Sequence, residues 1–254
     1  MRTLFAFLKK EILETIRTNK ITILLVLSLV FGIMNPAIAK LTPWLMKMFE
    51  ESLAESGIII GDIHVDALTS WQQFYKNIPM FLIAFVFIYS STLTKEYESN
   101  TLILLLTKGF SRYKVIIAKL INTVAMWTIS YFLIFIITYL YNQYYWDNSI
   151  AEGLLLSVLT YYIFGLLIIS LIMLFSVLAN NNVGVLLFLS LTVGISYVIN
   201  FIPKFAKYNP ISLMNSYNIL IDKNQFEIIT IFIALAVSVL SILFSIKLFN
   251  KKTI

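Results

Sequence analysis

The sequence contains no cysteine and only one histidine, and charged residues make up just 13% of its 254 residues. The absence of cysteine excludes disulfides, zinc–thiolate centres and thiol chemistry. The charged share is about half of that in a typical soluble domain. Hydrophobic residues make up 59% of the chain, more than a soluble domain of this size can cover with polar side chains. Because a lipid bilayer removes the need for that cover, the composition indicates an integral membrane protein.

Long runs without Asp, Glu, Lys or Arg mark the segments that can cross a bilayer, because a charge at its centre costs about 2.5–3.5 kcal/mol. These runs cover residues 21–39, 77–94, 120–146, 153–203 and 228–246. A span needs about 20 residues, so the run 153–203 can hold two, with a turn at Asn180, Asn181 and Asn182. We therefore expect an all-α polytopic fold with six transmembrane helices, at about 21–40, 77–94, 119–141, 152–179, 183–202 and 226–247.

The placement of lysine and arginine predicts the orientation. If the N-terminus is inside, thirteen of the 19 basic residues lie in inner segments and six in outer ones. Both termini then face the cytoplasm, in a multi-pass protein of the plasma membrane. This asymmetry explains the net charge of +6, so no nucleic acid partner is expected. The tryptophans mostly fall near span ends, as in the aromatic belts of a membrane surface; they are Trp44, Trp71, Trp127 and Trp146.

Residues 1–20 are expected to form an amphipathic interfacial helix ahead of the six-helix domain 21–254. One face, within about 120°, is apolar and carries Leu4, Phe5, Leu8, Ile12 and Ile16. The other side carries Lys9, Lys10, Glu14 and Arg17. A helix of this kind lies in the headgroup layer. It is either an anchor or an elbow that touches a cytoplasmic partner.

The largest inner loop, residues 94–118, has a polar start and an apolar middle. Residues 95–100 are polar, and the aliphatic run Leu102–Leu106 follows. Gly109 then allows a turn, and Ser111 can cap the next helix. The aliphatic run is too short to span a membrane. It is therefore either a re-entrant packing helix or a docking helix for a cytoplasmic motor.

Several chemical signatures are missing. There is no Gly-x-x-x-x-Gly-Lys-Ser/Thr phosphate loop and no His-Glu-x-x-His, so neither ATP binding of that type nor metalloprotease chemistry is expected. No span interior carries an ionisable side chain other than tyrosine, which argues against ion coupling. Asp62, His64 and Asp66 alternate and could ligate a metal from a strand, but acidic loop residues are commonplace, and no metal is expected. The chain is not expected to be an enzyme.

The inner loop resembles that of the ABC-2 permease family, the membrane subunits of ATP-driven exporters. The family pattern is an acidic stretch, Gly-Thr-Leu, a leucine-rich run, a small residue with proline, Ser-Arg and Gly-Lys. The matching residues are Glu96, Glu98, Thr101, Leu102, Leu104, Leu105, Ser111, Arg112 and Lys119. Asn100 replaces the first glycine, Lys108-Gly109 replaces the small-proline pair, and Ala118 replaces the later glycine. The amphipathic N-terminus, the six spans and Asn209-Pro210 also fit, so the resemblance covers the whole chain.

The resemblance implies an exporter permease that moves an amphipathic or hydrophobic substrate, with ATP and magnesium bound by a separate ATPase subunit. The residues expected to couple to that subunit are Glu96, Glu98, Thr101, Leu102, Leu104, Leu105, Gly109, Ser111 and Arg112. Within the family the chain resembles most the permeases of peptide exporters, in particular those of phenol-soluble modulins. Permeases of bacteriocin or antibiotic immunity systems share these features. A membrane scaffold or sensor without a transport path is the alternative from another class.

The resemblance also implies a pair of permeases, formed by two copies of this chain or by this chain and a sister permease. Helices in lipid associate where small residues allow close approach. Ser28 and Gly32 offer this on the first span, and Ser190 and Gly194 offer it on the fifth. The same residues could instead pack helices within one protomer. Small residues on the sixth span are expected to pack inside the bundle; they are Ala234, Ser238, Ser241 and Ser245.

Overall fold

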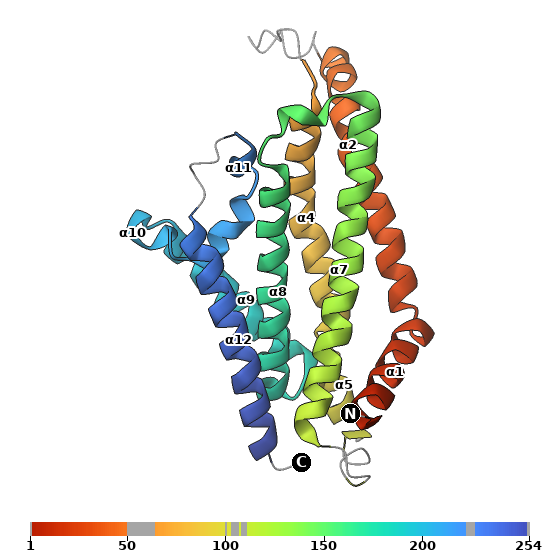
Figure 1. The fold of residues 1–254 in the computed structure, drawn as a ribbon, viewed down its shortest axis with the longest axis vertical. Coiled ribbons are helices and arrows are strands. Elements are labelled where there is room, and N and C mark those ends of the chain that lie inside the picture. The colour runs from red at the N-terminus through yellow and green to blue at the C-terminus, as the bar shows by residue number, and fades with distance from the viewer. Residues whose placement is uncertain are drawn as a thin grey trace.

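The computed structural model describes residues 2–49, 64–99, 101–102, 107, 111–221 and 227–252. These residues form helices and connecting turns, and none of them is in a strand. Six helices are long and apolar enough to cross a membrane, and they stand together as one bundle (Figure 1). They are α2 Lys20–Met48, α4 Ala67–Tyr89, α7 Arg112–Tyr145, α8 Leu154–Ala179, α9 Asn182–Asn200 and α12 Ile228–Lys251. The predicted all-α polytopic fold with six spans is confirmed.

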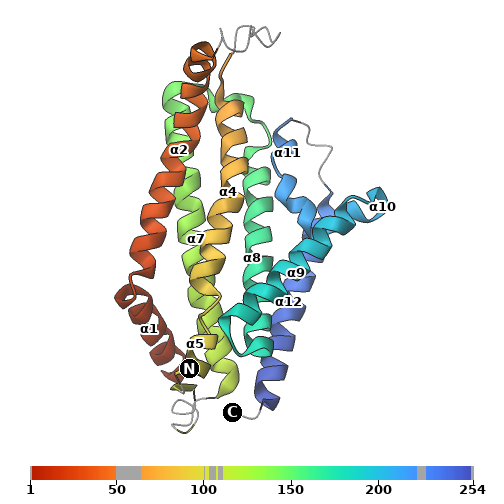
Figure 2. The ribbon, with the colours of Figure 1, turned by 180° about the vertical axis from the view of Figure 1, so that it is seen from behind.

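Short elements lie at the two ends of this bundle. Both termini lie at one end (Figures 1 and 2), called here the terminal end, and the opposite end is the far end. The terminal end carries α1 Arg2–Arg17 and α5 Thr94–Glu98. The half nearer the far end carries η1 Asn148–Ile150, α10 Pro203–Ala206, η2 Pro210–Asn215 and α11 Asn218–Ile221.

The helices continue beyond the apolar runs from which the spans were predicted. The helix α2 extends to Met48, past the expected end near residue 40, and α4 begins at Ala67 rather than near residue 77. A charge marks where the chain leaves hydrocarbon, but it does not end a helix. The start of α4 is set by Asp66, whose carboxylate accepts hydrogen bonds from the backbone N–H and the hydroxyl of Thr69. Of the three residues weighed as metal ligands, Asp66 therefore caps α4. Asp62 lies outside the described residues.

Asparagine makes the two sharp bends of the described chain. Asn19 (φ 57°) separates α1 from α2, and Asn180 (φ 61°) ends α8, both in the left-handed region that asparagine tolerates. Asn181 then caps α9, because its side-chain oxygen accepts from the backbone N–H of Gly184 at 2.7 Å. The predicted asparagine turn inside the run 153–203 is confirmed.

Aromatic side chains fill the centre of the bundle. Trp127 of α7 is fully buried and faces Gly165 of α8, where a Cβ atom would lie 2.2 Å from the indole ring. Trp71 of α4 is also buried, and its indole N–H donates to the side-chain oxygen of Asn148 at 3.1 Å. Trp127 and Trp71 therefore belong to the core and not to an aromatic belt, contrary to the sequence prediction. Trp44 is exposed, as a residue of an aromatic belt is expected to be.

A proline inside α2 creates a polar joint with α7. Pro36 has no N–H, so the carbonyl of Gly32, one turn earlier, has no partner within the helix. The hydroxyl of Thr138 on α7 donates to this carbonyl at 3.1 Å. The same hydroxyl accepts from the side-chain amide of Asn35, which in turn accepts from Asn77 of α4. Three helices are thus joined by hydrogen bonds that replace the one lost at the proline.

The small residues of α12 form its buried face. Ala234, Ser238, Ser241 and Ser245 are all buried. This helix packs mainly on α8, and the hydroxyl of Ser245 donates to the carbonyl of Met173 there. Small side chains let the two helices approach closely without a hydrophobic driving force between them. The packing predicted for the sixth span is confirmed.

Candidate functional site

The short helix α5 lies at the terminal end, next to α1 and the start of α7 (Figures 1 and 2). It follows α4 after a turn over residues 90–93. Its successive side chains face different surroundings, because neighbouring residues on a helix point about 100° apart. Glu96 is buried and Tyr97 is half-buried, whereas Lys95 and Glu98 are exposed. The helix can therefore contact the rest of the chain on one side and leave its other side exposed.

A buried ion-pair cluster joins α5 to α1 and α7. At its centre is Lys119 of α7, which is only 1% exposed. Its ammonium nitrogen lies 3.1 Å from both carboxylate oxygens of Glu11 on α1 and 3.1 Å from an oxygen of Glu96. These two glutamates are also buried. The lysine therefore holds an inward-facing carboxylate from each of two other elements.

Lys10 closes the cluster from the surface side. Its ammonium lies 2.7 Å from Glu96, 2.9 Å from Glu14 and 3.0 Å from Glu11. Burial alone would lower the pKa of Lys10, but the nearby carboxylates, first that of Glu96, raise that pKa above its ordinary value. Burial would likewise raise the pKa of Glu14, and the hydrogen bond from Lys10 lowers it overall. Both shifts favour the charged forms of Lys10 and Glu14, so these two residues form an ion pair near neutral pH.

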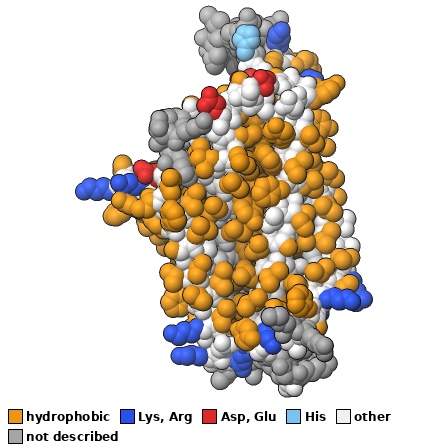
Figure 3. All heavy atoms as spheres, in the orientation of Figure 1, with side chains coloured by type: hydrophobic (Ala, Val, Ile, Leu, Met, Phe, Trp, Pro, Cys, Tyr) orange, Lys and Arg blue, Asp and Glu red, His pale blue; other side chains and the backbone are white. Residues whose placement is uncertain are grey.

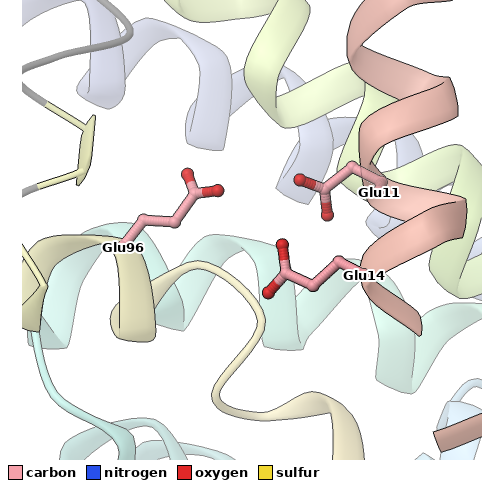
Figure 4. A group of neighbouring side chains, drawn as sticks. All are labelled: Glu11, Glu14 and Glu96. Carbon is pink, nitrogen blue, oxygen red and sulfur yellow. The ribbon is translucent and has the colours of Figure 1, made fainter. Parts of the chain in front are cut away.

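The three carboxylates of Glu11, Glu14 and Glu96 converge from α1 and α5 (Figure 4). Their ligand oxygens lie within 4.8 Å of one another, a spacing at which carboxylates can share a metal ion. Here each carboxylate already accepts an ammonium, from Lys10, from Lys119 or from both. Each of the three carboxylates thus has an ion-pair partner, although the cluster has only two ammoniums.

The other side of α5 contacts the end of α12. The ring of Tyr97 packs edge-on against Phe249, with centroids 6.3 Å apart, and the ammonium of Lys252 lies 4.5 Å from the Tyr97 ring. Arg112, at the start of α7, donates to the carbonyls of Phe249 and Lys252. These carbonyls are left over at a helix C-terminus, where a cation is favourable. The helix α5 therefore touches both the N-terminal and the C-terminal helix of the chain.

A second feature is the exposed face of α9. Only 11% of its apolar stretch is buried, against 61% for α8. Ser190 and Gly194 lie one turn apart on this helix, and among the described residues no atom outside the helix's own backbone lies within 4 Å of the position that a Cβ on Gly194 would take. Ser190 donates its hydroxyl to the carbonyl of Leu187, so it brings no unsatisfied polar group to the face. A further helix could approach this face closely.

An apolar groove runs between α4, α8 and α9. Its volume is about 680 Å³. Aliphatic and aromatic side chains line it from all three helices, among them Ile83, Val86, Phe164, Ile168 and Val193. Its polar lining is limited to the hydroxyls of Ser190 and Tyr197. Such a groove suits an apolar surface and offers nothing to a hydrated ion.

The model of a family described as ABC-2 family transporter proteins matches residues 5–253, almost the whole chain. The chain belongs to the ABC-2 transporter family. A comparison with individual curated proteins finds no match. Membership makes the chain the permease component of an ABC transporter, which works in the membrane with a separate ABC ATPase subunit.

The loop residues expected to couple this ABC-2 permease to its ATPase fall into two groups. Glu98 and Thr101 are exposed, as a docking role requires. Glu96 and Leu102 are buried within the protomer, Leu102 among Phe7 and other side chains of the terminal end. Leu102 therefore does not project toward a partner, contrary to the expectation that the whole aliphatic run inserts into one. Leu104, Leu105 and Gly109 lie outside the described residues.

The last two loop residues serve the permease itself. Ser111 occupies the N-cap position of α7, but its side chain makes no capping hydrogen bond. Arg112 binds the end of α12, as described above. Both residues are half-buried, so part of each side chain stays accessible to the ATPase.

The elbow helix α1 packs on the bundle with a stripe that lies beside the predicted apolar face, and Leu4 and Leu8 of that face pack with it. Its buried stripe is Phe7, Glu11 and Thr15, whereas the predicted apolar face is largely exposed, with Phe5, Ile12 and Ile16 at its surface. Among the predicted polar residues, Lys10 and Glu14 join the ion-pair cluster, and Lys9 and Arg17 are exposed. The reason is Lys119, since a buried ammonium requires carboxylates, and Glu11 supplies one.

Sequence reasoning placed Lys119 among the inner-loop charges and assigned no role to Glu11. The signal that could have found them is the apolar context of Lys119, which has Ile116, Ile117 and Leu120 beside it. A lysine in such a context has to be paired if it faces inward. No spacing rule names its partner, because α1 and α7 are far apart in the sequence.

The two candidate dimer pairs differ in the structure. Ser28 and Gly32 face α7 within the protomer, where a Cβ on Gly32 would lie 2.8 Å from a side-chain atom of Ile137. This pair packs the bundle, as the alternative interpretation held, and the dimer role proposed for it is not supported. Ser190 and Gly194 remain exposed on α9.

Proposed function

We propose that the permease exports an amphipathic peptide, of the phenol-soluble modulin kind, from the cytoplasm to the outside. Two protomers pair through α9, and ATP and magnesium are bound by ATPase subunits at the terminal end. The observation that carries this proposal is the apolar groove between α4, α8 and α9, which shares Ser190 and Gly194 with the pairing face and is lined almost entirely by apolar side chains. It can accept the apolar side of an amphipathic helix.

The charge distribution supports an orientation with the terminal end in the cytoplasm. In Figure 3 hydrophobic side chains cover the middle of the molecule, several basic side chains gather at the terminal end with others at the far end and on the projecting part, and the acidic ones in view lie toward the far end. Positive charge marks the cytoplasmic side of a membrane protein. With the terminal end inside, the groove lies between a cytoplasmic motor and the outer surface.

Docking of the ATPase is assigned to the exposed side of α5. Glu98→Lys reverses a charge there without touching the buried cluster, because Glu98 is exposed and Glu96 faces the other way. We expect the amount of ATPase that co-purifies with the permease to fall by roughly tenfold, since like charges facing each other at an interface cost several kcal/mol. Glu152→Lys, which makes the same change at the far end, should leave co-purification intact. Equal recovery with both variants would place the docking surface elsewhere.

Transport is tested with a matched pair of substitutions. Ile83 in the groove and Leu243 on α12 are each 57% exposed, and only Ile83 lines the groove. Ile83→Gln should lower ATP-driven uptake of a labelled amphipathic helical peptide into inside-out vesicles by about tenfold, because the new amide loses its water when the peptide binds. Leu243→Gln faces lipid alone and should transport normally. If wild-type vesicles take up no peptide, or if both variants transport equally, the proposal is wrong.

A further inference from the structure

A polar cleft lies in the half of the molecule nearer the far end, where α10, η2 and α11 meet α8, α9 and α12 (Figures 1 and 2). Its volume is about 360 Å³, enough for a small organic group. It is separate from the apolar groove, with which it shares no lining residue. Its polar side chains are four hydroxyls, three asparagine amides, one carboxylate and one lysine.

The hydroxyl groups of the cleft can only accept. Thr160 donates its proton to the carbonyl of Leu156, and Thr230 donates to that of Lys207. Ser212 and Ser216 likewise donate to backbone carbonyls. A carbonyl cannot donate in return, so each hydroxyl presents its lone pairs to the cleft and has no proton left for a ligand.

Two further acceptors line the cleft, and the amides of Asn215 and Asn218 bring both donors and acceptors to it. The side-chain oxygen of Asn200 is buried and has no hydrogen-bond partner among the described residues. A buried acceptor left unpaired costs about 1–3 kcal/mol, so a ligand that donates to it gains that amount. Glu227 adds a carboxylate that forms no ion pair with the described residues.

The one basic residue of the lining is directed to a neighbour. The backbone carbonyl of Lys207 accepts a hydrogen bond from the hydroxyl of Thr230. The ammonium of Lys207 lies 5.0 Å from the centre of the Tyr208 ring. Tyr208 does not line the cleft. The cleft thus presents several acceptors and the carboxylate of Glu227, which has no ion-pair partner among the described residues, a combination complementary to a primary ammonium group with its three donors.

We propose that this cleft binds a primary ammonium, and that the group belongs to the exported peptide, as a lysine side chain or the free amino terminus. The identification of the peptide as its source rests on the proposed function; the recognition of an ammonium does not. The carboxylate of Glu227 and the oxygen of Asn200 receive its hydrogen bonds. A site of this kind would hold the polar side of an amphipathic peptide while its apolar side occupies the groove.

The test measures binding without transport. The full-length permease is placed in nanodiscs of phosphatidylcholine, and a fluorescent Lys-Phe-Lys amide with a free amino terminus is titrated by anisotropy. The same tripeptide with all amines acetylated should bind at least about tenfold more weakly, because charge-assisted hydrogen bonds are the strong ones. Glu227→Gln and Asn200→Val should each weaken the binding of the free peptide several-fold. The matched variant Glu152→Gln lies outside the cleft and should not.

The ammonium could also come from a lipid headgroup. Nanodiscs that contain phosphatidylethanolamine distinguish the two sources. If this lipid weakens the binding of the tripeptide, the cleft binds an ammonium and the site is assigned to the lipid headgroup. If it does not, the site is assigned to the peptide. Equal binding of free and acetylated peptides, or unchanged binding in Glu227→Gln, overturns the proposal. That failure leaves the exporter proposal standing if peptide uptake into vesicles is intact, so the two proposals fail separately.

Discussion

Lys119→Met is expected to destabilise the permease by up to about 3–5 kcal/mol, because it leaves the buried carboxylates of Glu11 and Glu96 with only the partly exposed Lys10 as a counter-charge among the described residues. The lysine binds Glu11 and Glu96, and both are less than 5% exposed. Methionine fills a similar volume, so packing changes little and the lost charge dominates. Thermal unfolding of the purified protein in detergent measures the effect, as a fall in the transition temperature.

Two controls separate charge from packing. Lys114→Met lies nearer the start of α7 and removes a lysine whose ammonium donates, within the described structure, only to the exposed hydroxyl of Thr3. We expect this variant to change the free energy of unfolding by no more than about 0.5 kcal/mol. The triple variant Glu11→Gln, Glu96→Gln, Lys119→Met removes all three charges and should recover much of the lost stability. If Lys119→Met unfolds at the wild-type temperature, the cluster does not hold α1 and α5 to the bundle.

The functional consequence concerns coupling. Glu96 lies on the same short helix as the exposed Glu98, where the ATPase is proposed to dock. A displacement of α5 by the ATPase therefore has to move α1 and α7, or break ion pairs whose rupture is costly. Variants of Lys119 that still fold should bind the ATPase but hydrolyse ATP without export.

The number of spans could be predicted from the sequence because the bilayer imposes one rule on every segment. Charge-free runs of sufficient length had to be helices, and Asn180 to Asn182 had to be a turn, since no other residues in 153–203 could end a helix in that place. The small residues of α12 were assigned correctly for a similar reason. Lipid gives helices no reason to meet except close packing.

Contacts between distant segments could not be predicted in this way. Lys119 was read as an inner-loop charge, although a carboxylate on α1, more than one hundred positions earlier, allows it to be buried. Leu102 was read as a docking residue, although the pocket that buries it is made by α1, α7 and α12. Hydropathy describes what a residue would prefer to contact. It does not say which of several apolar or charged surfaces the fold brings to it.

Gly194→Leu is expected to separate the two protomers and leave each one folded. Among the described residues, the position of the new Cβ atom has no neighbour within 4 Å outside the helix's own backbone, so the larger side chain meets no obstacle there. At a helix interface in lipid, the association depends on the close approach that small residues permit. Mass photometry of the purified permease should therefore show a shift from dimer to monomer, with an unchanged unfolding temperature. Ala236→Leu, at an exposed position of α12, should leave the dimer intact.

Gly32→Leu provides the opposite pattern, because the same substitution falls at a contact within the protomer. Its Cβ would lie 2.8 Å from a branched atom of Ile137, and overpacking of this kind costs about 1–3 kcal/mol. We expect a lower unfolding temperature, with the protein that stays folded still dimeric. The two glycines thus distinguish an interface from a core by the same chemical change. A dimer that survives Gly194→Leu would show that the protomers meet through another face, and α9 would then be a lipid-facing wall of the groove.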